Sequence, residues 1–101
     1  MKLSVLERIL LLQILPQEGS FTNLKLLRIV REELSFSEKE NKELEFKQTG
    51  THTTWSPTYT IEKEIEIGSV VFEIVKKSLL KLDKEEKLTE GHMSLYEKFM
   101  Q

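Results

Sequence analysis

The sequence lacks cysteine altogether and contains only two histidines, His52 and His92, among its 101 residues. The absence of cysteine excludes disulfide bonds, thiolate-bound metals and thiol nucleophiles, and it suits a reducing cytoplasm. No pattern marks a partner that would orient either histidine as a base, and the carboxylates show no metal-ligand spacing. We therefore expect a cytoplasmic protein that is not an enzyme, with no catalytic residues, cofactor or metal. A carboxylate-based active site is the remaining enzymatic alternative, because carboxylates are numerous.

Isolated glycines argue against a phosphate-binding loop, and a balanced charge argues against a nucleic-acid-binding protein. The four glycines are far from one another in the sequence, so the chain has no glycine-rich loop that would cradle a phosphate group. Residues 1–50 carry eight basic and eight acidic side chains, and residues 51–101 carry seven and nine. Neither half has the basic excess that is typical of nucleic-acid-binding proteins.

A nearly continuous apolar stretch, Leu3–Leu15, lies near the start of the sequence. As a helix it would be about 20 Å long, whereas a membrane span needs about 20 apolar residues. Glu7 and Arg8 fall inside it, where a signal peptide requires an apolar segment. The stretch therefore predicts a helix, ended by Pro16, that lies in the middle of the domain or at a subunit interface. It predicts no association with a membrane.

Two more helices are expected before the sequence pattern changes. Phe21 and Thr22 have the pattern of a hydrophobic staple and its cap at the start of the second helix. That helix has an apolar stripe with two further apolar residues beside it: Leu27, Val30 and Leu34, then Leu26 and Ile29. Two overlapping cap patterns, Ser35/Glu38 and Ser37/Glu40, predict a short third helix over about residues 37–42.

The period of the hydrophobic residues changes from helical to alternating in residues 44–67. Leu44–Lys47 alternates briefly, and Tyr59–Ile67 alternates over nine residues, with three glutamates on its polar face. These are strand patterns, so we expect an antiparallel hairpin whose loop lies within Gln48–Thr58. Lys63 interrupts the apolar face of the second strand and indicates an edge position or an outward bend.

Helical spacing returns after residue 68. Apolar residues from Val70 to Leu82 predict a fourth helix, and Thr89 is expected to cap a fifth, with Leu88 and Met93 as its staple. We therefore expect one compact α+β domain, residues 1–101. It is predicted to be mainly helical, with four to five helices and one antiparallel β-hairpin between the third and fourth helices.

Trp55 is the first candidate for a binding surface. It is the one tryptophan of the chain, and it lies in a loop rich in threonine and serine, near His52 and Tyr59. A tryptophan in such a loop is the type of residue that anchors interfaces, but it can equally fold back to cover the hairpin. Both interpretations stay open, and Trp55, His52 and Tyr59 are the candidate interaction residues.

The two ends of the sequence resemble a known group of proteins. Leu15-Pro16-Gln17-Glu18-Gly19 follows the leucine-rich start, and Leu88-Thr89-Glu90 precedes Leu95-Tyr96-Glu97-Lys98-Phe99. In these two segments the chain is similar to the small accessory proteins of phages and prophage-like bacterial regions. The resemblance implies a cytoplasmic accessory protein that acts by binding, and it transfers no catalytic or binding residues.

Two functions from different classes follow from these patterns. The apolar excess of the first helix, and a hairpin that is marginal alone, predict a protein that acts through protein–protein contact and self-associates as a homodimer or larger assembly. The alternative is a winged-helix-like DNA-binding regulator, because three helices followed by a hairpin is the element order of that class. Glu38, Glu40 and Glu43 would then face phosphates, which disfavours DNA binding.

Overall fold

The computed structural model describes residues 1–50 and 52–100, and it describes no side chain for Thr49 or His52. The described residues form five α-helices and four short strands, in the order β1, α1, α2, α3, β2, β3, β4, α4, α5. The helices are α1 (Val5–Ile14), α2 (Phe21–Leu34), α3 (Glu38–Leu44), α4 (Ser69–Lys84) and α5 (Met93–Met100), with a 3₁₀ turn, η1 (Glu90–His92), before α5. The mainly helical α+β fold predicted from the sequence is confirmed.

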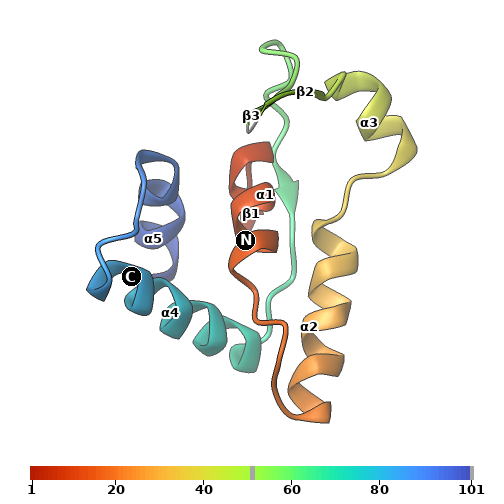
Figure 1. Ribbon diagram of the computed structural model, residues 1–101. Coiled ribbons are helices and arrows are strands. Elements are labelled where there is room, and N and C mark those ends of the chain that lie inside the picture. Colours follow the sequence, from red (N-terminus) through yellow and green to blue (C-terminus); the bar gives the residue numbers. More distant parts are fainter. Residues whose placement is uncertain (51, 101) are drawn as a thin grey trace.

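The N-terminal apolar stretch forms the central helix, α1. It lies between α2 on one side and the α4–α5 pair on the other (Figure 1), and it contacts α2, α4 and η1. The predicted start at Leu3 is two residues too early, because Ser4 caps the helix. The Ser4 hydroxyl accepts a hydrogen bond from the Glu7 N–H (3.2 Å), and the Glu7 carboxylate accepts one from the Ser4 N–H (2.9 Å). This capping box leaves Leu3 in an extended segment.

That extended segment is a strand that the sequence pattern did not reveal. β1 (Lys2–Leu3) pairs antiparallel with β4 (Lys63–Glu64), with Lys2 opposite Glu64. The predicted strand Tyr59–Ile67 is therefore largely extended loop, and its paired part joins the N-terminal segment. Ile65, which follows β4, is fully buried, as the alternation predicts, whereas Ile61 is exposed.

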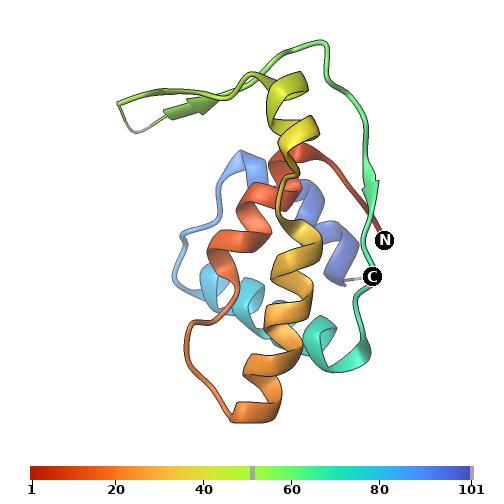
Figure 2. The same ribbon diagram turned by 90° about the vertical axis from the view of Figure 1, so that its right-hand side faces the viewer.

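The β-hairpin lies between α3 and α4, as predicted, but its strands differ from those expected. β2 (Lys47–Thr49) pairs antiparallel with β3 (His52–Thr54), so the strands run from the last residue of the first predicted strand into the segment that was expected to contain the loop. Gly50 adopts a φ of 62°, which suits the tight turn of a hairpin. Leu44 is unavailable to a strand because it is buried in the last turn of α3. The hairpin projects from the helical body (Figure 2).

Lys63 has a specific partner that explains its place in the apolar face. Its Nζ donates a hydrogen bond to the Glu33 carbonyl oxygen (2.8 Å), near the C-terminal end of α2. A cation at this end of a helix satisfies a free carbonyl and is favoured by the helix dipole. Lys63 therefore fastens the extended segment to α2.

Helix α2 begins at a different cap from the one predicted. The Ser20 hydroxyl, not Thr22, accepts a hydrogen bond from the Asn23 N–H (3.1 Å), and Phe21 is exposed rather than stapled. The predicted apolar stripe is confirmed, since all three of its residues are buried: Leu27, Val30 and Leu34. Of the two patterns predicted to start the third helix, Ser37 with Glu40 forms the capping box, whereas Ser35 ends α2.

The C-terminal half completes the core. Val71, Val75 and Leu79 of α4 and Leu95 and Phe99 of α5 are buried in the same apolar cluster. Thr89 caps η1, as predicted for the last helix, but Met93 is exposed, so the predicted staple is absent. Among residues 1–50 and 52–100, the structure has no helix that is both long and apolar enough to cross a membrane.

Candidate interaction surface

Arg8 of α1 is completely enclosed and ties three elements together. Its Nε donates to the Leu34 carbonyl oxygen (3.2 Å) and its Nη2 to the Ser35 carbonyl oxygen (2.8 Å), at the end of α2. Its Nη1 lies 2.6 Å from Glu40 Oε2 of α3. The guanidinium also lies 4.0 Å from the centre of the Phe36 ring. Arg8 is 1% exposed. The charged residue that interrupts the apolar stretch is therefore buried, and its contacts are made inside the protein.

This contact changes the acidity of Glu40. The Arg8 guanidinium, together with the Ser37 N–H, lowers the pKa of Glu40 to about 2 against the opposing effect of partial burial. Glu40 is therefore a carboxylate at neutral pH and is committed to two structural contacts. It is not poised to exchange a proton in a reaction.

Glu7 is the second buried charge of α1. Its Oε1 accepts hydrogen bonds from the Ser4 N–H and from Lys98 Nζ (2.8 Å) of α5. Burial raises the pKa of Glu7, but hydrogen bonds from Lys98, Ser4 and Ser94 outweigh burial and lower the pKa below its usual value. Lys98 also donates to the Lys2 carbonyl oxygen (2.7 Å). This ion pair therefore joins the first strand, the first helix and the last helix.

Trp55, the first sequence candidate, packs back against the base of the hairpin. Its ring lies edge to face against Phe46, with 6.2 Å between centroids, and Phe46 packs in the same manner against Phe36 at 5.2 Å. Trp55 is half-buried and lines a small hollow of about 200 Å³. These contacts favour the interpretation that Trp55 covers the hairpin, and its role in binding stays a prediction.

The other two sequence candidates are not shown to join Trp55 in one site. Tyr59 is half-buried, and burial raises the pKa of its hydroxyl, with the negative charges of Glu40 and Glu43 raising it further. The Tyr59 N–H donates to the Ser56 carbonyl oxygen (3.2 Å), and the Ser56 N–H donates to the Leu44 carbonyl oxygen (2.7 Å) at the end of α3. His52 belongs to β3, but its side chain lies outside the described residues, so its proposed contact stays a prediction.

His92 has a structural contact within its own turn. Its Nδ1 lies 3.0 Å from the Thr89 backbone nitrogen and 2.9 Å from the Thr89 hydroxyl oxygen, and the residue is largely buried. In the part of the chain that the structure describes, no three histidine, aspartate or glutamate side chains are placed to share a metal ion.

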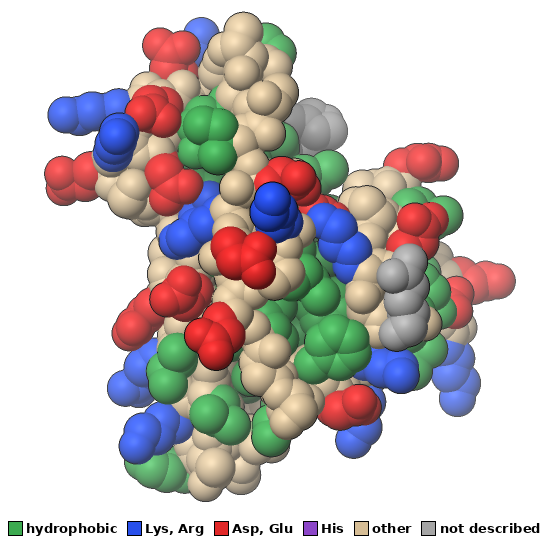
Figure 3. All heavy atoms as spheres, turned by 180° about the vertical axis from the view of Figure 1, so that it is seen from behind, with side chains coloured by type: hydrophobic (Ala, Val, Ile, Leu, Met, Phe, Trp, Pro, Cys, Tyr) green, Lys and Arg blue, Asp and Glu red, His purple; other side chains and the backbone are tan. Residues whose placement is uncertain are grey.

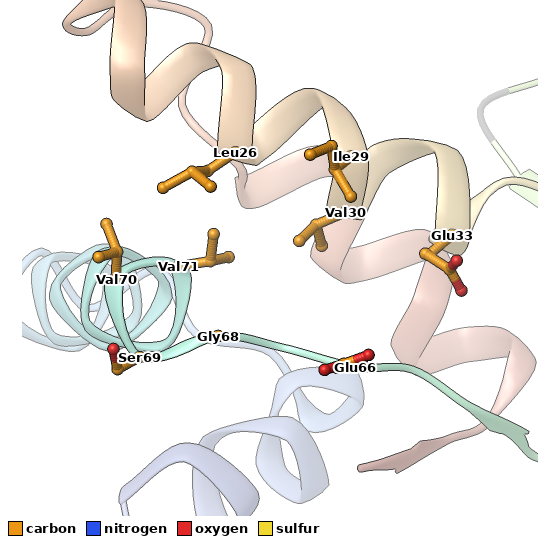
Figure 4. A pocket seen from close by; sticks show the side chains of 9 residues that line it. All are labelled: Leu26, Ile29, Val30, Glu33, Glu66, Gly68, Ser69, Val70 and Val71. Carbon is orange, nitrogen blue, oxygen red and sulfur yellow. The ribbon is translucent and has the colours of Figure 1, made fainter.

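A groove with mostly apolar walls lies between α2 and the start of α4, with a volume of about 340 Å³. Figure 4 shows Leu26 of α2 and Val70 of α4 extending into the same space from opposite sides, with Val30 and Val71 at its floor. Glu33 of α2 and the extended segment that ends at Gly68 close one end of the groove. The walls are therefore apolar and one end is acidic.

Two side chains of this groove expose much apolar surface. Ile29 is 54% exposed and Val70 is 46% exposed. Figure 3 shows this face: hydrophobic side chains gather in its lower half, and acidic side chains border them above. A contiguous apolar patch with a polar border is typical of an interaction site. We call this groove, whose outer apolar side chains are Leu26, Ile29 and Val70, the α2–α4 groove.

Sequence patterns placed the residues of this groove in the helices but did not separate them from the core. Leu26, Ile29 and Val70 were expected to lie on or beside the buried stripes, yet Ile29 and Val70 are exposed and Leu26 is only partly buried. The available signal was the width of the apolar arc: α2 carries apolar residues at positions 26 and 29 in addition to the three that it buries. An arc wider than one neighbour covers leaves some apolar residues in solvent.

Comparison with known proteins does not indicate a function for this surface. The chain matches no protein-family model, no curated protein and no solved structure.

Proposed function

We propose that this is a small non-enzymatic accessory protein of the cytoplasm that acts by binding another protein chain through the α2–α4 groove. The observation that carries the proposal is the exposure of Ile29 and Val70 on facing walls of an apolar groove. Removing such surface from water is favourable by about 25 cal/mol per Å². A partner that covered the groove would gain this energy without a change in the fold of the described helices.

The polar groups in the interior support a binding role rather than catalysis. Arg8 is paired with Glu40, and Glu7 is paired with Lys98, so each of these charges is engaged in a contact between elements of the fold. Nucleophilic catalysis needs a base within reach of a nucleophile and of a space for substrate. The α2–α4 groove offers apolar walls, two carboxylates, Glu33 and Glu66, and the Ser69 hydroxyl, which makes no hydrogen bond to either carboxylate among the described residues.

A substitution in the groove tests the proposal against a matched control. Val70→Asp places a charge in the groove, whereas Leu80→Asp places one on the same helix at a residue of equal exposure, 45%, that does not line the groove. In a pull-down from native host lysate with nuclease, we expect wild-type protein and Leu80→Asp to retain a stoichiometric protein partner. We expect Val70→Asp to lose at least about 90% of it, because an aspartate that remains charged is costly to bury. Equal retention by all three proteins would contradict the role of the groove.

A winged-helix-like DNA-binding regulator is the second candidate, favoured by one observation. The β2–β3 hairpin follows α3 directly and projects from the body as a wing would (Figure 2). The charges oppose it, because α3 carries Glu38, Glu40 and Glu43 against Lys39 and Lys42. Phosphate contacts are strongest at low salt, so we expect no retention on duplex DNA at about 50 mM salt. Salt-sensitive retention would favour this candidate over the first.

A further inference from the structure

The exposed face of α2 carries opposite charges on the two sides of Ile29. Lys25 and Arg28 lie in the N-terminal direction, and Glu32 and Glu33 lie in the C-terminal direction. All four side chains are exposed. Because side chains four residues apart share a helix face, Lys25, Ile29 and Glu33 form one stripe with an apolar centre.

This stripe is complementary to itself in one orientation. If two copies of α2 pack antiparallel about Ile29, the two isoleucines meet, and Lys25 of each copy lies opposite Glu32 and Glu33 of the other. A two-fold axis repeats each contact, as an interface between identical surfaces requires. A parallel arrangement would instead place lysine opposite lysine and glutamate opposite glutamate, which is unfavourable.

We infer that the occupant of the α2–α4 groove is a second copy of this chain, with α2 packed antiparallel against α2 about Ile29. This inference rests on the proposed function and names its partner. The second copy covers the exposed Ile29 and the adjacent Leu26 wall of the groove. Lysines and glutamates that flank an apolar seam set the orientation of paired helices, which is the role that Lys25, Glu32 and Glu33 take here.

Charge reversal in two complementary variants tests this arrangement. Lys25→Glu alone places three glutamates together at each end of the interface, and the double variant Glu32→Lys/Glu33→Lys places three lysines together. Each variant alone is expected to dissociate about tenfold more readily than the wild type, because both symmetric contacts become repulsive. An equimolar mixture restores opposite charges at both ends. We expect it to form a dimer of one copy of each variant, with an affinity within about threefold of the wild type.

The measurement is sedimentation equilibrium of the full chain over a wide concentration range, with circular dichroism to establish that each variant is folded. Dimers of the wild type and of the mixture, with weakened association of each variant alone, support the inference. A wild-type dimer that both reversals leave unchanged overturns it and places self-association on another surface. A wild-type protein that stays monomeric at high concentration, or folded variants that do not recover on mixing, overturns it as well. In those cases the Val70→Asp pull-down still decides the proposed function independently.

Discussion

Replacing Arg8 with methionine is expected to lower the free energy of unfolding by about 3–5 kcal/mol. Methionine keeps much of the buried volume but leaves the carbonyl oxygens of Leu34 and Ser35 and the carboxylate of Glu40 without their donor. Removing one member of a buried, hydrogen-bonded pair costs more than the pair contributes when intact, because desolvated groups remain unsatisfied. Urea unfolding at neutral pH measures the loss.

The control is Arg28→Met on the exposed face of α2, for which we expect a change within about 0.5 kcal/mol. That comparison uses protein dilute enough to be monomeric, since Arg28 borders the proposed dimer contact. A loss of less than about 1 kcal/mol for Arg8→Met would contradict the structural role assigned to the Arg8 contacts.

The ion pair between Arg8 and Glu40 also affects how the free energy of unfolding depends on pH. The pKa of Glu40 is lowered from 4.5 to about 2 in the folded protein, so unfolded chains bind this proton first as the pH falls. The stabilising contribution is complete above pH 4.5 and is lost as the pH falls toward 2. A shift of this size corresponds to about 3 kcal/mol. Arg8→Met removes the main cause of the shift, so its unfolding free energy should fall less steeply between pH 5 and pH 2.

Phe99→Ala is expected to destabilise the protein by about 3–5 kcal/mol. Phe99 is completely buried, and its ring lies 4.9 Å from that of Phe72 on α4. The truncation leaves a cavity between α4 and α5 and removes the largest apolar contact of the last helix, because Phe99 is the largest side chain that α5 buries.

Urea unfolding measures this effect, and native-state hydrogen exchange shows whether α5 opens before the remaining helices. Met93→Ala serves as the control because Met93 lies on the same helix but is exposed, so its loss should be below about 0.5 kcal/mol. If Phe99→Ala were as mild as the control, α5 would not be docked as described.

Local patterns predicted the positions of the helices well, because each helix has its own apolar periodicity. Two examples are the stripe of Leu27, Val30 and Leu34 and the Ser37 capping box. Each is formed by residues that are close together in the sequence. Strand pairing was less predictable. β1 is only two residues long, which is too short for any alternation to appear, and its partner β4 lies about 60 residues later. The hairpin strands were missed because Lys47–Thr54 is polar on both faces and has no apolar alternation.

The partners of the buried charges could not be predicted from the sequence, for a different reason. Arg8 and Glu7 were expected only to interrupt an apolar stretch, and nothing near them in the sequence identifies Glu40 or Lys98 as their partners. Their contacts span separations of 32 and 91 residues, so they exist only once the helices are packed. The groove depends in the same way on which neighbour covers α2, a property of the assembled fold rather than of one helix.

The ion pair between Glu7 and Lys98 has a consequence for the order in which the protein is made. During translation Glu7 leaves the ribosome when Lys98 has not yet been synthesised, and α1 alone is a short helix that is marginal in water. Until Lys98 emerges, enclosing the Glu7 side chain would desolvate a carboxylate that has no cationic partner. We therefore expect the central helix to stay hydrated while the ribosome extends the chain, and the core to close around it after α5 has been synthesised. Ribosome-bound chains that end before Lys98 should accordingly remain open to proteases.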